Sequence, residues 1–97
     1  MLVQFRYSET DFVAYLVAIG YKIIKIETTF SKTSGKRTFA FVEGEQDKLI
    51  SLYEEYKNGF LDVNVSDFIK ARRYVSKQMK KSYSSLGWEL ITNKTNS

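Results

Sequence analysis

Hydrophobic residues recur along the chain with two periods, one typical of helices and one of strands. The clearest helical pattern lies at residues 66–81, where apolar side chains three or four positions apart form one narrow stripe. The stripe consists of Phe68, Ala71, Val75 and Met79. Ser66 is a suitable N-cap, and Asp67 at the start and Lys80 and Lys81 at the end match the helix dipole. This segment is predicted to be a helix with one buried side.

Two more helices are predicted earlier in the chain. Residues 12–19 are apolar almost all round, which favours a buried helix that begins near Ser8–Asp11, at capping-box spacing, and ends at Gly20. Residues 46–58 have an apolar side and a Gly stop at Gly59. That side consists of Leu49, Leu52, Tyr53 and Tyr56.

The alternating pattern predicts a β-hairpin. Residues 21–30 and 37–42 are rich in β-branched and aromatic side chains, and the polar connection at 31–36 contains Gly35 for a positive φ. Glu43-Gly44-Glu45 is expected to end the second strand. In the first strand, the face expected to meet the core carries Ile24, Ile26, Thr28 and Phe30.

These elements predict an α+β fold, with a small antiparallel hairpin-based sheet packed against about three helices. The expected order is helix, strand, strand, helix, short strand, helix, where residues 60–65 form the short strand or an extended link. A lone hairpin is marginal in water, so a third strand from residues 1–7 or 60–65, or a second copy of the chain in a homodimer, should complete the sheet.

We expect one domain over residues 1–91 and a flexible polar tail over 92–97. The stretch after Lys81 contains Ser82–Ser85 and Gly87 and is predicted to be a turn or tail. Beyond it, Trp88, Leu90 and Ile91 could pack back on the body.

Composition excludes several kinds of chemistry. The chain has 97 residues without Cys or His. Disulfides, thiol catalysis, the usual zinc sites and imidazole-based catalysis are therefore excluded. No segment approaches the about 18–20 apolar residues that span a membrane, and the N-terminus lacks the pattern of a signal peptide. We expect a soluble protein of the cytoplasm.

Charge is concentrated on the last predicted helix. Residues 67–81 carry six Lys or Arg against one Asp, a net of +5, while the whole chain is +4. Such asymmetry bears on partners rather than on the fold. The basic side is either an ordinary solvated helix face or the binding surface for an anionic partner.

Seven basic residues are the candidate contacts with nucleic acid or another anion. They are Lys70, Arg73, Lys77, Lys80 and Lys81 on the helix, with Lys36 and Arg37 on the hairpin. They would neutralise phosphates, and an exposed Tyr21 could stack on an unpaired base. We find no zinc finger and no usual RNA-recognition signature, so binding would be dominated by phosphates, and Phe39 and Phe41 are interpreted as sheet packing.

Other functions find less support in the sequence. Gly35-Lys36-Arg37-Thr38 resembles the end of a phosphate-binding loop, but Phe30 stands where that motif needs its first Gly. Glu43, Glu45 and Asp47 precede a helix, where negative charge is favoured by the dipole alone. The apolar stripe of the basic helix is needed for the core, which argues against a membrane surface. We expect no catalysis, no metal and no cofactor.

Four stretches resemble a family of small uncharacterised domains found in phages, prophages and some bacteria and archaea. They are DFVAYLVAIGYKIIKIE, SGKRTFAFVEGE, LISLYEEYKNG and VNVSDFIKARRYVSKQMK, together covering about residues 10–81. The resemblance implies a compact α+β domain in a viral or mobile-element setting, and it carries over no site residues. We therefore expect a phage accessory protein that binds nucleic acid. The alternative is a counter-defence or regulatory protein that binds a host protein or sequesters a nucleotide signal.

Overall fold

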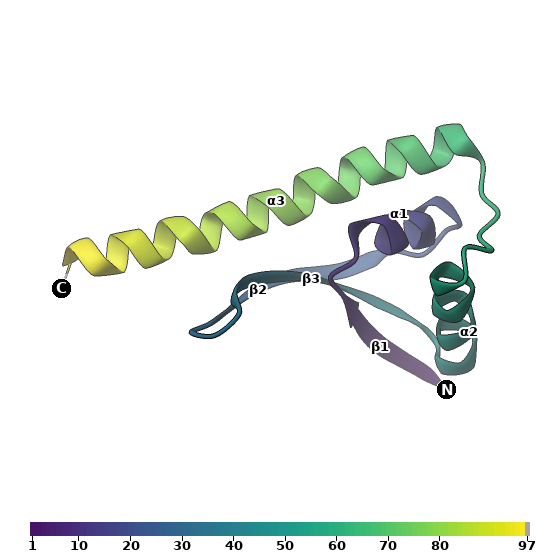
Figure 1. Ribbon diagram of the computed structural model, residues 1–97, viewed down its shortest axis with the longest axis horizontal. Helices are drawn as coiled ribbons and strands as arrows, with labels where there is room; N and C mark the ends of the chain where they lie inside the picture. The colour runs from purple at the N-terminus through teal and green to yellow at the C-terminus, as the bar shows by residue number, and fades with distance from the viewer. Residues whose placement is uncertain (97) are drawn as a thin grey trace.

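Three helices and a three-stranded antiparallel sheet form an α+β fold (Figure 1), which confirms the predicted fold class. The computed structural model describes the backbone of residues 1–96 and the side chains of residues 1–84. The elements in order are β1 (Leu2–Tyr7), α1 (Thr10–Ala18), β2 (Ile23–Ser31), β3 (Gly35–Glu45), α2 (Gln46–Lys57) and α3 (Val65–Asn96).

The sheet has the strand order β1-β3-β2, with β3 in the centre. Tyr7 pairs with Ala40 at one end of the β1–β3 ladder, and Leu2 pairs with Glu45 at the other. Since β1 and β2 are both antiparallel to β3, they run parallel to each other on its two sides, and β1–α1–β2 is a split βαβ unit. Residues 1–7 thus supply the third strand.

The predicted short strand at residues 60–65 is wrong. Residues 60–64 form no strand and lead into α3, while β1 supplies the third strand of the sheet. The Asn64 Oδ1 atom accepts a hydrogen bond from the Asp67 N–H at 3.1 Å. Asn64 rather than Ser66 therefore caps the helix.

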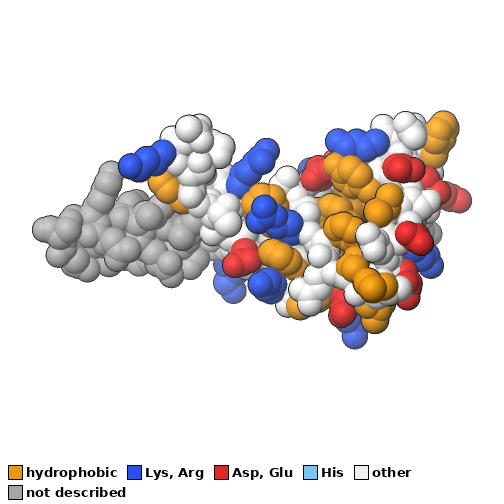
Figure 2. All heavy atoms as spheres, turned by 90° about the horizontal axis from the view of Figure 1, so that it is seen from below, with side chains coloured by type: hydrophobic (Ala, Val, Ile, Leu, Met, Phe, Trp, Pro, Cys, Tyr) orange, Lys and Arg blue, Asp and Glu red, His pale blue; other side chains and the backbone are white. Residues whose placement is uncertain are grey.

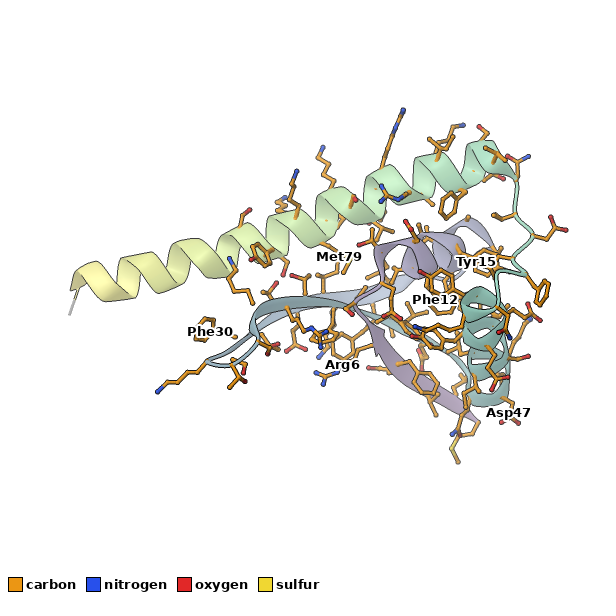
Figure 3. The ribbon with its side chains drawn as sticks, in the orientation of Figure 1. Arg6, Phe12, Tyr15, Phe30, Asp47 and Met79 are labelled. Atoms are coloured by element: carbon orange, nitrogen blue, oxygen red, sulfur yellow. The ribbon has the colours of Figure 1, made fainter. Side chains whose placement is uncertain are left out.

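The prediction for the core face of β2 is only half right. A register irregularity lies between Ile23 and Lys25, and it shifts the alternation of side chains along the strand. Ile23 and Ile26 pack against the core, whereas Ile24 is 46% exposed. Phe30 is 57% exposed because it lies near the hairpin tip, beyond the core (Figure 3).

Gly44 does not end β3 as predicted, because the strand continues through Glu45. Gly44 is buried, and a Cβ atom there would lie 2.8 Å from Tyr21 Cε1 and 3.1 Å from Leu49 Cδ1. The missing side chain lets α2 and Tyr21 approach the sheet closely. Tyr21, expected to face outward, is therefore half-buried against β3.

The first two helices follow the sequence pattern closely, except at the first cap. In α1 the side chains from Phe12 to Leu16 are all buried. Gly20 ends the helix with a φ of 114°, as predicted. Glu9 rather than Ser8 is the N-cap, and the Ser8 hydroxyl donates to the Glu9 carboxylate at 3.4 Å. The second helix covers the predicted segment, and Gly59 follows it with a φ of 78°.

The predicted apolar stripe of α3 is confirmed, but the predicted end of the helix is wrong. Ala71, Val75 and Met79 are buried and Phe68 is half-buried. The helix continues through the expected turn at 82–87 to Asn96. The Ser82 hydroxyl, hydrogen-bonded to Thr28 at 2.8 Å, ties this part of the helix to the hairpin. The expected packing of Trp88, Leu90 and Ile91 lies outside the described side chains, and the flexible tail at 92–97 stays a prediction.

The core is rich in aromatic rings between the sheet, α1 and α2 (Figure 3). Phe12 contacts Tyr7 edge-to-face, with ring centroids 4.9 Å apart, and it also meets Tyr53 and Tyr56. Burial, with the nearby Glu9 carboxylate, raises the pKa of Tyr7 to about 12. The Tyr53 hydroxyl donates a hydrogen bond to Glu9. Burial is the largest single influence and acts to raise the pKa of Glu9. The hydrogen bonds that its carboxylate accepts and the nearby Lys57 ammonium together outweigh burial, so the pKa lies below its ordinary value.

Replacing Tyr53 by Phe should lower the free energy of unfolding by about 1 kcal/mol at neutral pH, because the Glu9 carboxylate loses its hydrogen bond. A carboxyl group with a depressed folded-state pKa stabilises the fold above its unfolded value of 4.5, and this contribution is lost as the pH falls through the folded pKa. The difference between the variant and the wild type should therefore shrink below pH 4.5. Urea unfolding of the variant and the wild type at several pH values measures this difference in the free energy of unfolding.

The matched control is Tyr74→Phe, because Tyr74 is 54% exposed on α3. This substitution should change stability by less than about 0.5 kcal/mol at every pH. A Tyr53→Phe effect that is independent of pH would contradict the role given to Glu9.

Candidate anion-binding cleft

A cleft of about 620 Å³ lies between α3 and the first residues of β3. Its walls come from three parts of the chain that are distant in sequence. The lining residues are Ser8 and Thr10; Lys36, Arg37 and Thr38; and Ser76, Lys77, Met79, Lys80 and Tyr83.

The pairing of the strands leaves room for this cleft. Because β1 pairs only with Ala40–Glu45, the first residues of β3 have an unpaired edge on that side. A chain of hydroxyls holds α3 above this part of the hairpin: Thr38 contacts Thr28 at 2.9 Å, and Thr28 contacts Ser82 at 2.8 Å. Met79 is buried beneath α3 (Figure 3), and the Thr10 hydroxyl lies 3.8 Å from its sulfur. These contacts connect α3 with the hairpin and with the start of α1.

The charge of the lining has one sign. Four of the ten lining residues are Lys or Arg, and none of the ten is Asp or Glu. The Lys36 ammonium, which comes from the β3 wall, lies 3.7 Å from the centroid of the Tyr83 ring on the α3 wall. Lys77 and Lys80 are exposed on α3 at the other wall. Ammonium groups with neighbouring hydroxyl donors suit a phosphate or another oxyanion.

The structure brings together four of the seven basic residues that the sequence suggested as contacts. Lys36, Arg37, Lys77 and Lys80 line the cleft, and the other three are exposed on α3 outside the lining. Those three are Lys70, Arg73 and Lys81. Arg37 stands between Lys36 and Thr38, which face α3, so its side chain points to the opposite face of the sheet. It borders the cleft with its backbone.

Two other groups of charged residues have structural roles. The Arg72 Nε atom donates to the Asp11 carboxylate at 2.6 Å and so links α3 to α1. Among Glu43, Glu45 and Asp47, the acidic residues around the start of α2, Glu45 forms an ion pair with the Met1 amino group at 2.8 Å. Within the part of the chain that the structure describes, no group of three or more acidic side chains is placed to hold a metal ion.

Sequence reasoning missed the hydroxyl-bearing side chains of the cleft. Ser8 and Thr10 were interpreted only as a helix start, and their position opposite α3 depends on the tertiary fold. On α3 a signal was present, since Ser76, Lys80 and Tyr83 are spaced four and three residues apart and share one helix side. That pattern of hydroxyl, cation and aromatic ring could have marked the wall of the cleft.

The fold and the cleft define a small α+β domain built on a split βαβ sheet, with three helices on one face. The chain belongs to the family "Domain of unknown function (DUF5659)", whose profile matches residues 3–82. This match extends the expected resemblance to include β1, and it ends at Ser82 of α3. No curated protein and no solved structure matches the chain significantly. Among the described residues, no helix combines the length and apolar character needed to cross a membrane.

Proposed function

We propose that this protein binds nucleic acid through the phosphate backbone, with the cleft and the adjoining basic side of α3 as the contact surface. The observation that carries the proposal is the lining of the cleft, to which Lys36, Lys77 and Lys80 contribute ammonium groups and no acidic residue contributes. Lys70, Arg73 and Lys81 extend the positive surface along the same helix. A polyanion longer than the cleft would contact both the cleft and this adjoining side of α3.

Binding of this kind is driven by the release of counterions from the nucleic acid. Each phosphate that a Lys or Arg neutralises adds about 0.7 to 0.9 to the slope of log affinity against log salt. The exposed positions of Lys77 and Lys80 suit such contacts, because their ammonium groups reach a phosphate without a change of the fold. Sequence-specific contacts with base edges are not part of the proposal.

The proposal includes the setting that the sequence resemblance implies. A non-enzymatic accessory protein of a phage or mobile element would act in the cytoplasm of the host cell, where nucleic acid is abundant. No catalytic group is needed for this function, and no cofactor or metal enters it.

A second candidate is sequestration of a nucleotide signal. The cleft volume of about 620 Å³ lies in the range of small-molecule pockets, about 300–1,000 Å³. The same ammonium groups would then hold the phosphates of a single nucleotide. The two candidates differ in the length of the ligand, which the experiment below separates.

Replacing Lys77 and Lys80 together by Gln should weaken the binding of oligonucleotides by about tenfold or more at moderate salt. The salt slope for single strands should fall by about 1.4, because two phosphate contacts are lost. Fluorescence anisotropy with labelled single- and double-stranded DNA and RNA at about 50 and 200 mM salt measures both quantities.

The matched control is the double variant Lys22→Gln and Lys48→Gln, which removes the same charge at exposed positions outside the cleft. It should weaken binding by less than about threefold. Absence of wild-type binding at the lower salt would overturn the proposal, as would equal effects of the two double variants. Tight binding of a free nucleoside triphosphate without binding of oligonucleotides would favour the second candidate.

A further inference from the structure

The sheet has a second surface, on the face away from the helices. The residues of β3 alternate, so that Ala40, Val42 and Gly44 are buried beneath the helices while Phe39 and Phe41 point to the other side. Strand pairing sets Arg6 of β1 and Lys25 of β2 on the two sides of Phe41. Figure 3 shows Arg6 on the side of the sheet away from α3.

Cations cover both aromatic rings on this open face. The Arg6 guanidinium lies 4.4 Å from the centroid of the Phe39 ring, and the Lys25 ammonium lies 4.5 Å from that of Phe41. Figure 2, which views the molecule from below, shows Lys and Arg side chains among hydrophobic ones. At exposed sites such contacts contribute only about 0.5–1 kcal/mol each. A flat ligand could therefore displace these long side chains from the rings.

The central strand carries most of a known base-stacking pattern. The core strand of RNA-recognition domains follows K/R-G-F/Y-G/A-F-V-x-F/Y, and the segment that begins at Arg37 reads R-T-F-A-F-V-E-G. This partial match was missed at the sequence level, where Phe39 and Phe41 were assigned to sheet packing. In such domains the sheet aromatics stack two or three bases.

The two departures from this pattern both fall on the helix side of the sheet. Thr38 replaces a Gly, and its hydroxyl contacts Thr28 beneath α3. Gly44 replaces an aromatic residue and faces Tyr21 and Leu49. Neither departure alters the open face, which keeps a cation and two rings at alternate positions of one strand. The position of the strand also agrees with that of RNA-recognition domains, because β3 is the central strand of a split βαβ sheet.

We propose that Phe39 and Phe41, flanked by Arg6, Lys25 and Arg37, stack unpaired bases of a single-stranded nucleic acid. This inference rests on the proposed function and names its ligand class, since the bases of a duplex are not available for stacking on a sheet. The unpaired edge of β3 joins the two surfaces: Arg37 and Phe39 face one side, and Lys36 and Thr38 face the cleft. A strand that crosses this edge has its bases on the open face and its phosphates near the lysines.

The acidic residues of the open face limit where the strand can run. Glu27 lies beside Phe39 in the register and is 3.6 Å from Lys25, which neutralises it. Glu43 and Glu45 follow on β3 towards α2. Glu45 is paired with the Met1 amino group, so it is the Glu43 carboxylate that repels phosphates and directs the strand to the half of the sheet near the hairpin, where Arg37 stands.

The test replaces Phe39 and Phe41 together by Leu, which keeps an apolar side chain but removes the stacking ring. Single-strand binding, measured by anisotropy, should weaken by about tenfold or more. The slope against salt should stay unchanged, because no phosphate contact is removed. The double Phe→Tyr variant at the same positions should restore binding, since it keeps the rings.

Phe60→Leu is the matched control, because Phe60 is 75% exposed in the loop before α3 and should not affect binding. Circular dichroism and thermal unfolding verify that each variant is folded. The wild type should also bind a single strand more tightly than a duplex of equal length. Equal affinity for the two, or wild-type affinity of the folded Leu variant, would overturn the inference.

The outcomes separate this inference from the proposed function. If the Lys77 and Lys80 variant loses binding while the Phe39 and Phe41 variant keeps it, only the stacking surface is refuted. If the reverse holds, the cleft is refuted as the phosphate site and the stacking surface stands. A wild type that binds no oligonucleotide at low salt refutes both, and the open face would then be a surface for another class of partner.

Discussion

Replacement of Phe12 by Ala should lower the free energy of unfolding by about 3–5 kcal/mol. Phe12 is fully buried, and its ring is the common partner of Tyr7, Tyr53 and Tyr56 at centroid distances of 4.9, 5.1 and 5.1 Å. The substitution leaves a cavity where β1, α1 and α2 meet, and it also removes the edge-to-face contacts. Since domains of this size are stable by only about 5–15 kcal/mol, the loss is a large fraction of the total.

Urea unfolding followed by far-ultraviolet circular dichroism measures this change. Phe60→Ala is the control, because the Phe60 side chain is largely exposed and should contribute less than about 0.5 kcal/mol. A loss below about 1 kcal/mol for Phe12→Ala would mean that the aromatic cluster is not a tightly packed core.

Replacement of Val75 by Asp should cost about 4 kcal/mol or more at neutral pH. Val75 is fully buried in the stripe that joins α3 to α1, between Ala71 and Met79. An ionised carboxylate there has no partner, so burial raises its pKa in the folded state above the unfolded value of about 3.9. The cost of the charge is absent below the unfolded pKa and grows as the pH rises, because only the unfolded chain then ionises readily.

The control is Tyr74→Asp, which places the same side chain one residue earlier on α3, at a position where Tyr74 is 54% exposed. It should cost less than about 1 kcal/mol and show no comparable dependence on pH. Equal costs for the two variants would show that α3 does not pack on α1 through its apolar stripe. Because α3 forms one wall of the cleft, the Val75 variant should also lose oligonucleotide binding to the extent that it unfolds.

The pattern of the sequence was sufficient to locate the three helices and most of the hairpin, although not the C-terminal end of α3 or the N-caps of α1 and α3. The stripe of Ala71, Val75 and Met79 is buried as its spacing predicted, since a helix of 3.6 residues per turn places those positions on one side. Glycine stops at Gly20 and Gly59 were also correct, because a positive φ suits a residue without a Cβ atom. These features depend on neighbours within a few residues.

Errors arose where a distant segment decides the local structure. Gly44 reads as a strand breaker, but it is a close-contact point for Tyr21 and Leu49. Ile24 reads as a core residue, but an irregularity in the ladder with β3 turns it outward. The helix beyond Lys81 is held by Thr28 through Ser82, 54 residues apart in the chain. Pattern alone could not reveal these contacts.

The candidate site divides in the same way. By itself the sequence determined that positive charge gathers on one helix and that Lys36 and Arg37 adjoin a turn, because charge and turn propensity are local properties. Only the tertiary structure decided that Lys36 faces Lys77 and Lys80 across a cleft while Arg37 points to the other side of the sheet. The physical reason is the period of a strand: adjacent residues alternate between faces, and the pairing with distant strands and helices decides which face is covered.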